Sequence, residues 1–307
     1  MSLIQLQDIP LPDHTRPGGF DHAAIHYASA RLYVAHTINN ALDVIDCHTD
    51  RYHHSIPDLI GVAGVLVSEE GNLVFTSNRG ENTVGIFRPD DEANLFKVPV
   101  GVRPNGLAFD TGHGLLLAAN VGDPDIPSSY TLSIVNLEKR KQVRSIPVPG
   151  RTRWAVFDDR SNLFYVNIAD PAQIVVLSSQ DTPHIARIIA IPSLGPHGLD
   201  LDVDQNRLYC ACDARALVTV DLDTGEPSSV LDLSGVPDVV FYNADLKHLY
   251  IAIGDPGLID VFDTQAMAKV DAVPTEKGAH TLAFDAGRNK VYAFLPQSHR
   301  ALVFADR

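Results

Sequence analysis

Short apolar runs and polar residues alternate along this chain in a pattern that repeats seven times. Most repeats open with a polar residue and a short apolar run, and after a turn comes a run rich in β-branched and aromatic residues, such as residues 32–35. A third run alternates apolar and polar positions, as in residues 258–263, and a more polar fourth run closes the repeat. Runs of this length predict strands, and the Gly, Asn and Asp residues between them predict tight turns.

The spacing of the repeats predicts the fold. The opening positions recur every 41 to 48 residues and are His22, Ala63, Asn105, Arg153, His197, Asp238 and His280. A fixed period near 40 residues, with several short strands per unit, is typical of a β-propeller with one blade per repeat. We therefore expect an all-β, seven-bladed β-propeller with four antiparallel strands per blade, in one domain over residues 1–307. The expected blades are about 20–61, 62–101, 102–150, 151–195, 196–235, 236–278, and 279–307 together with 1–19.

The N-terminal segment is expected to close the ring. The last repeat supplies only about three strands before Arg307. Residues 3–9 alternate in polarity and precede Pro10, as the fourth strands of other repeats do. A strand from the N-terminus would complete the seventh blade and leave no open seam between the first and last blades.

Composition argues against several classes of partner and location. The formal net charge is −14, which argues against binding to nucleic acid or to an anionic membrane surface. No apolar run approaches the roughly 18 residues of a membrane span. We find no signal peptide and expect a cytoplasmic protein, although a periplasmic or secreted chain with a processed N-terminus would look the same. Three cysteines give no even disulfide framework, and we expect Cys210 and Cys212, which share one face of a strand, to be buried.

The repeats resemble those of the YncE-like, YVTN-repeat propeller family over essentially the whole chain. The phrases that carry the resemblance are residues 20–22, 33–36, 42–46, 82–84 and 165–167. The resemblance implies the propeller fold, and relatives look like lactonases, lyases, metal-binding proteins or non-catalytic binding proteins. The chain departs from the pattern at two openings, because Ala63 stands where His is often seen and Arg153 where Glu or Asn is commoner.

Four opening residues would form a metal site at one mouth of the channel. His197, Asp238, His280 and His22 belong to consecutive blades around the ring. Three imidazoles and a carboxylate suit a divalent ion such as Zn²⁺, Mn²⁺, Fe²⁺ or Ca²⁺. Such an ion would polarise a carbonyl or activate a bound water, with His197, His280 and His22 as the catalytic residues. The alternative is that these polar side chains hold trapped water in a wet channel.

The opposite arc of openings predicts a binding site for a small anionic molecule. Arg153 would pair with a substrate carboxylate, and Asn105 would orient a substrate oxygen. Asn120 and Asn167, at the ends of second strands, would support the site by hydrogen bonds. Trp154 is the only tryptophan and would stack on the substrate, although packing between blades is the commoner role of an aromatic side chain.

Two functions remain open from the sequence. The first is a metal-assisted hydrolase, lactonase-like, or a lyase that acts on a small anionic carbonyl compound. The second is a non-catalytic propeller that binds a ligand or a protein partner through its loops. We find no Gly-rich phosphate loop and therefore expect no organic cofactor.

Overall fold

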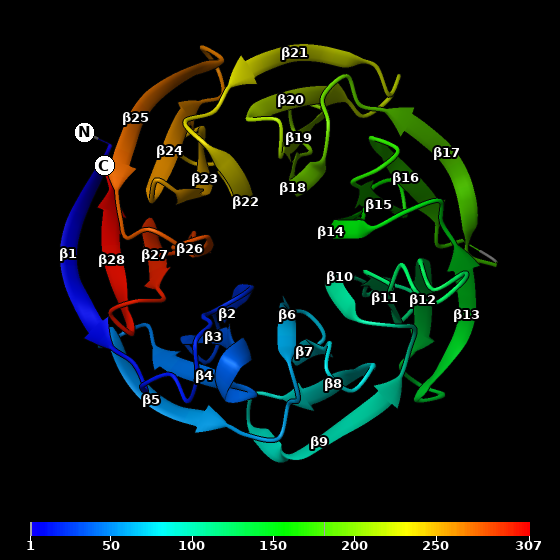
Figure 1. Ribbon diagram of the computed structural model, residues 1–307, viewed down its shortest axis with the longest axis horizontal. Helices are drawn as coiled ribbons and strands as arrows, with labels where there is room; N and C mark the ends of the chain where they lie inside the picture. The colour runs from blue at the N-terminus through cyan, green and yellow to red at the C-terminus, as the bar shows by residue number, and fades with distance from the viewer. Residues whose placement is uncertain (1, 181) are drawn as a thin grey trace.

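Seven four-stranded antiparallel sheets stand around a central axis in the computed structural model, as Figure 1 shows. The structure describes residues 2–180 and 182–307; Met1 and Asp181, which fall in the predicted units 1–19 and 151–195, lie outside the described residues. The prediction of an all-β, seven-bladed propeller with four antiparallel strands per blade is confirmed.

The first three blades follow the chain order from the axis outward. Blade 1 contains β2 (Ala23–His26), β3 (Arg31–His36), the short 3-10 helix η1 (Thr37–Asn39), β4 (Ala41–Asp46) and β5 (Arg51–Ile56). Blade 2 contains β6 (Val62–Ser68), β7 (Leu73–Asn78), β8 (Thr83–Arg88) and β9 (Asp91–Pro99). Blade 3 contains β10 (Pro104–Asp110), β11 (Leu115–Asn120), β12 (Thr131–Asn136) and β13 (Lys141–Pro147).

The other four blades complete the circle. Blade 4 contains β14 (Thr152–Asp158), β15 (Leu163–Ile168), β16 (Gln173–Ser178) and β17 (His184–Ala190). Blade 5 contains β18 (Pro196–Asp202), β19 (Arg207–Cys212), β20 (Ala216–Asp221) and β21 (Pro227–Asp232). Blade 6 contains β22 (Val236–Asn243), β23 (His248–Asp255), β24 (Leu258–Asp263) and β25 (Ala268–Pro274). Blade 7 contains β26 (Thr281–Asp285), β27 (Lys290–Leu295), β28 (Arg300–Asp306) and the N-terminal β1 (Leu3–Pro10).

The N-terminal strand closes the ring as predicted. β1 pairs antiparallel with β28, from Leu3 opposite Asp306 to Pro10 opposite Arg300. The two ends of the chain therefore lie side by side (Figure 1). Closure of this kind leaves the seventh blade with the same four strands as the others and removes the seam at which a propeller would open.

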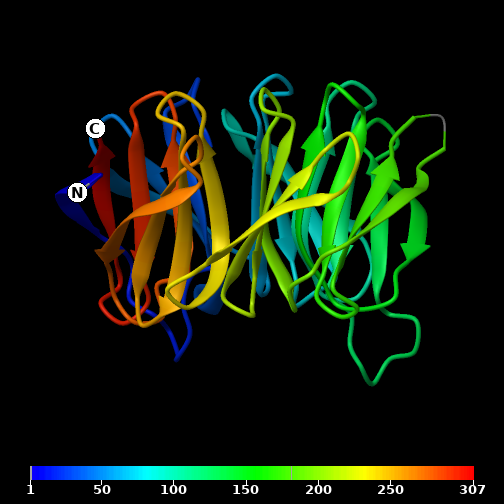
Figure 2. The same cartoon turned by 90° about the horizontal axis from the view of Figure 1, so that it is seen from above.

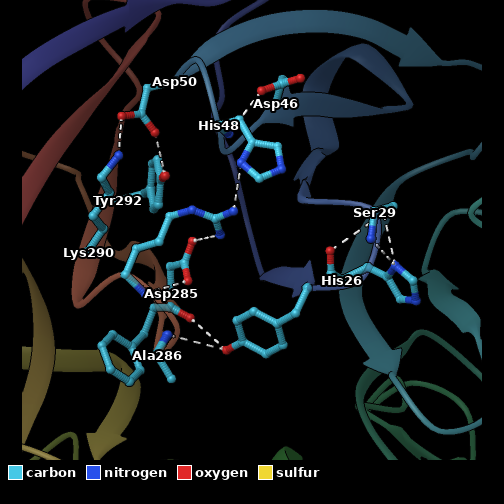
Figure 3. Close-up of polar contacts among 12 residues, drawn as sticks. His26, Ser29, Asp46, His48, Asp50, Asp285, Ala286, Lys290 and Tyr292 are labelled. Atoms are coloured by element: carbon cyan, nitrogen blue, oxygen red, sulfur yellow. Dashed lines mark hydrogen bonds and ion pairs between the residues drawn. The ribbon is translucent and has the colours of Figure 1, made fainter.

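Polar contacts between blades 7 and 1 add to this closure, as Figure 3 shows. Tyr292 of β27 donates a hydrogen bond to the Asp50 carboxylate of blade 1, at 2.6 Å, and Lys290 donates to the same carboxylate. Arg288 lies 3.0 Å from Nδ1 of His48. Asp50 is almost fully buried, so its pairing with Lys290 and Tyr292 satisfies a charge that would otherwise be costly.

The core lies between neighbouring blades. The second strands supply large side chains that are almost completely buried there, namely Tyr33, Phe75, Leu117, Tyr165, Tyr209, Tyr250 and Tyr292. Aromatic and β-branched residues favour such a pleated, enclosed surface, which explains their enrichment in the second strand of each repeat.

The first strand of every blade lines the axis and begins at the same face of the ring, which we call the mouth face; the opposite face is the far face. The second strand returns to the mouth face, because it is antiparallel to the first. The long connections at residues 11–22 and 121–130 both lie at the mouth face and project from it in Figure 2. None of the helices in residues 2–180 and 182–307 is long and apolar enough to span a membrane.

Candidate functional site

The centre of the mouth face holds a contact between three of the predicted opening residues. Nε2 of His197 lies 3.1 Å from Nη1 of Arg153 and 3.3 Å from Oδ1 of Asp238. These side chains come from the first strands of blades 4, 5 and 6, each within the first few residues of its strand. The circular arrangement of the blades thus brings together residues that lie far apart in the sequence.

Asp213 joins this group from the connection after β19. Its Oδ1 lies 2.7 Å from Nδ1 of His197, and its Oδ2 accepts a hydrogen bond from Nη2 of Arg153 at 3.2 Å. Burial opposes ionisation of Asp213, but the hydrogen bond and charge of His197, together with the charge of Arg153, hold its pKa below the usual value. Asp213 is therefore an anion at neutral pH that fixes both neighbours.

The contacts of His197 define its tautomer. In the neutral imidazole, Nε2 accepts a hydrogen bond from Arg153, because a guanidinium can only donate. Nδ1 then carries the ring proton and donates it to Asp213. When the ring is protonated, Nε2 instead pairs with Oδ1 of Asp238, 3.3 Å away. The neutral form places a basic nitrogen at the mouth of the channel, held by a carboxylate on its other side.

Asp238 has cationic or ionisable partners on several sides. Its burial favours the neutral acid, yet the neighbouring imidazoles of His197, His280 and His22 and the guanidinium of Arg153 keep its pKa below the usual value. Burial opposes protonation of His280, but Asp238 and Asp21 raise the pKa of its imidazole above the ordinary value. Nδ1 of His280 lies 2.8 Å from the Gly278 carbonyl oxygen and so acts as the donor.

His22 is the most enclosed of the predicted ligands. Its Nε2 lies 3.4 Å from Oδ1 of Asp21. Burial lowers the pKa of the imidazole, an effect that Asp21 and Asp238 oppose and Arg79 reinforces. His22 is therefore mostly neutral at pH 7, and its pKa is shifted in the opposite direction to that of His280.

Four arginines surround the mouth on the side of blades 2 to 4. Burial lowers the pKa of the Arg151 guanidinium, and the neighbouring charges of Arg153, Arg79 and Arg103 lower it further. Arg151 therefore lies close enough to the other three guanidinium groups to be repelled by them. Nη2 of Arg79 donates to Oδ1 of Asn105 at 2.8 Å. Such a cluster is suited to an anion that bears more than one oxygen.

Trp154 closes the bottom of this polar site. Its ring centroid lies 4.0 Å from that of His22, so the indole of blade 4 meets the imidazole of blade 1 across the axis. A second, edge-on contact at 6.5 Å joins Trp154 to Phe241 of blade 6. Trp154 thus packs between blades, as expected, but it also contacts His22 at the axis. Its stacking on a substrate stays a prediction.

Two of the three predicted asparagines, Asn120 and Asn167, lie behind the site. Asn167 is fully buried, and its Nδ2 donates to the carbonyl oxygens of His197 and Gly198 at 2.9 and 3.2 Å. Asn120 is also fully buried and donates to Thr131 within its own blade. Asn167 therefore positions the backbone that carries His197, which is the supporting role expected from its place at the end of a second strand.

The existing contacts of the predicted metal ligands bear on whether they can hold an ion. Within residues 2–180 and 182–307, no group of three or more His, Cys, Asp or Glu side chains is placed so that it could hold a metal ion. Both ring nitrogens of His197 already have partners, so ligation by Nε2 would require Arg153 to withdraw. Metal binding by His22, His197, Asp238 and His280 stays a prediction.

Asp21 carried no prediction of a role, and Arg79 was expected only as a basic neighbour on the anion-binding side. Asp21 immediately precedes the opening residue of blade 1, and Arg79 follows the second strand of blade 2. Nη2 of Arg79 donates to Oδ2 of Asp21 at 3.3 Å. Their positions in the repeat could have indicated a role at the site, because the residue before a first strand and the residue after a second strand both reach the mouth face.

The fold and the mouth together define a seven-bladed β-propeller with an arginine-rich polar site at one end of its axis. No family model matches the chain, and no curated protein matches it. Among solved structures, 1813 chains match, so the architecture is shared widely. One of them is Kuenenia stuttgartiensis hydrazine synthase, with a TM-score of 0.80 and 13% sequence identity over 95% of this chain and 96% of that chain. At this identity the likeness shows the fold alone, and the resemblance to YVTN-repeat propellers stays a prediction.

Proposed function

We propose that the chain binds a small anionic carbonyl compound at the mouth and acts on it as a lactonase-like hydrolase or a lyase. The observation that carries the proposal is the contact of Arg153 with both members of the His197–Asp213 pair. This contact places the Arg153 guanidinium, a group that recognises carboxylates, beside the His197 imidazole, which is oriented as a base. A net charge of −14 makes four clustered arginines at one mouth a specific feature rather than part of a generally basic surface.

The chemistry follows from the placement of these side chains. The substrate carboxylate binds the guanidinium of Arg153, which then no longer donates to Nε2 of His197. In lactone hydrolysis, Nε2 takes a proton from water as its oxygen bonds to the carbonyl carbon. The ring C–O bond then breaks, and the leaving alkoxide receives the proton back from His197. Asn105, whose Oδ1 is held by Arg79, offers its amide nitrogen to the carbonyl oxygen as negative charge develops there.

A divalent metal ion would be held by His22, His280 and Asp238, with His197 joining if Arg153 moves. The ion would polarise the carbonyl group of the substrate. The convergence of the three imidazoles on Asp238 supports this part of the proposal, and the existing bonds of His197 weigh against it.

Turnover of a carboxylate-bearing lactone tests the catalytic proposal. We expect ring opening of 5-oxotetrahydrofuran-2-carboxylate, or of a related lactone acid or ester in the same panel, by protein purified without chelator. His197→Gln is expected to abolish it, whereas His184→Gln, on an exposed strand of the outer ring, leaves it unchanged. Elemental analysis, with a repeat assay in chelator, decides whether metal takes part.

The results of this panel distinguish enzyme from binding protein. Binding of lactone acids with no turnover of any of them would leave a non-catalytic propeller, the alternative function. Turnover that survives His197→Gln would contradict the assigned base. Stoichiometric metal that is lost in His280→Ala, together with loss of turnover in chelator, would support the metal-assisted form.

A further inference from the structure

A second cavity lies behind the Trp154–His22 contact and opens toward the far face. It has a volume of about 620 Å³, which is within the usual range for small-molecule sites. Its lining runs from His22 and Trp154 along the first strands to Tyr27 and Glu69 at their far ends. Of the seven opening residues at the mouth, His22 alone is in its described lining. The cavity is thus a separate compartment of the same channel.

The walls of this cavity are mostly apolar and aromatic. Phe109, Phe157, Phe241 and Phe284 contribute rings in addition to Trp154. In blades 1 to 4 and 6, the residue three positions after the opening residue lines the cavity and is aliphatic or aromatic. Blade 5 carries Asp200 at this position, so a single carboxylate interrupts an apolar layer.

Asp200 has a structural role that leaves it able to bind a ligand. Its Oδ1 accepts from the amide of Leu201 at 2.8 Å, and its Oδ2 accepts from the amide of Tyr242, in the next blade, at 2.7 Å. Each carboxylate oxygen has a second lone pair for another donor. Burial raises the pKa of this carboxyl to about 6, so it is mostly ionised at pH 7.5 while facing an apolar space.

The charges around the cavity favour a cation. Its described lining includes the carboxylates Asp200, Glu69 and Glu70 and contains no Lys or Arg. The only imidazole in the lining is His22, which burial keeps neutral. The mouth, by contrast, is rich in arginine, so the two ends of the channel have opposite electrostatic preferences. Aromatic faces add to the attraction for an organic ammonium group.

We propose that this far-face cavity is a binding site for a small hydrophobic amine. The ammonium group pairs with Asp200, and the apolar part fills the space between the phenylalanines and Trp154. The site is separate from the anion site of the mouth and does not depend on the function proposed for it.

Calorimetric titration at pH 7.5 with 2-phenylethylamine, 2-phenylethanol and phenylacetate tests the proposal. These probes share a ring and differ in charge. We expect the amine to bind about tenfold more tightly than the alcohol, since a hydrogen bond between charged groups is stronger than a neutral one, and phenylacetate to bind most weakly. Asp200→Asn is expected to remove the preference for the amine. Asp90→Asn, a matched change at an exposed turn, should preserve it.

A second variant keeps the test decisive if Asp200→Asn does not fold. Val156 lines the cavity, and Val156→Phe is expected to reduce binding of the amine at least tenfold by filling part of the space. Three results would overturn the proposal: no binding of the amine at millimolar concentration, equal binding of amine and alcohol, or undiminished binding to Val156→Phe. Loss of the preference in Asp238→Asn but not in Asp200→Asn would place the cation at the mouth instead and would also overturn it.

Discussion

The rings of Trp154 and His22 meet across the axis of the propeller, with their centroids 4.0 Å apart. Trp154 belongs to blade 4 and His22 to blade 1, so the contact joins opposite sides of the ring. It separates an arginine-rich mouth from an apolar cavity. The channel of this protein is therefore two compartments with different chemistry rather than one continuous pore.

This contact predicts a pH-dependent change in the fluorescence of the single tryptophan. Burial, the largest effect, lowers the pKa of His22 below 6.5, so the ring is neutral at pH 7 and gains its proton only in more acidic solution. A protonated imidazole beside an indole is expected to quench its emission. We expect quenching with a midpoint below pH 6.5, measured by steady-state fluorescence. His22→Gln should remove the transition, and a midpoint above pH 6.5 would contradict the assigned environment.

Closure of the ring by β1 predicts that two neighbouring substitutions differ in effect. Ile9 is buried in the core between blades 7 and 1, whereas Leu6 of the same strand is exposed. We expect Ile9→Ala to lower the free energy of unfolding by about 2–4 kcal/mol, and Leu6→Ala to change it by less than about 0.5 kcal/mol. Denaturant titration measures both. Equal, small effects would mean that β1 contributes little to the closed ring.

Asp200 predicts a specific pH dependence of stability. Its folded pKa of about 6 lies above the 3.8 of an unperturbed carboxyl. The folded state therefore binds the proton more tightly, and this contribution to stability is full below pH 3.8 and is lost as the pH rises through 6. Between pH 4 and 7 the wild type should lose about 2 kcal/mol relative to Asp200→Asn. Unfolding curves over this range measure the difference, and a constant difference would show that the pKa is unshifted.

The three thiols are expected to be unreactive in the folded protein. Cys47, Cys210 and Cys212 are all fully buried. Burial also raises the pKa of Cys47 to about 12 and that of Cys210 well above its usual value, which suppresses the nucleophilic thiolate. The hydrogen bond with Cys210 lowers the pKa of Cys212, so burial alone protects this thiol. Titration with an aromatic disulfide reagent should detect no fast-reacting thiol in native protein and three after denaturation. A rapid reaction in native protein would contradict this account of the core.

The sequence predicted the fold well because strand patterning and repeat length are both local properties. The opening position of each repeat could be aligned without knowledge of contacts, and the alternation in residues 3–9 was sufficient to predict that β1 completes blade 7. Circular closure then follows from the number of repeats. For the same reason, the approach of His197 to Asp238 at one mouth was accessible from the sequence.

The contact partners of these residues were harder to predict from the sequence. Asp21 and Arg79 lie in connections, where side-chain direction is not set by a strand period, and their contact depends on the geometry of two separate blades. The pairing of Arg153 with His197 could not be predicted either, because it places a cation on the nitrogen expected to bind metal. The register of the first strand of blade 4 shifts between Thr152 and Ala155, so a simple alternation of side chains does not predict the direction of Trp154.

Direct binding of oxo acids is the measurement that tests the central claim, an anion site built on Arg153. The wild type, Arg153→Met and the control Arg160→Met would be titrated with oxo acids of three to six carbons and with their neutral methyl esters. Arg160 is a suitable control because it lies on an exposed turn at the far end of the same blade. The account predicts that at least one acid binds the wild type and Arg160→Met equally, that its ester does not bind, and that Arg153→Met weakens binding at least about tenfold. Acids that bind no better than their esters, or that bind Arg153→Met as well as the wild type, would contradict it.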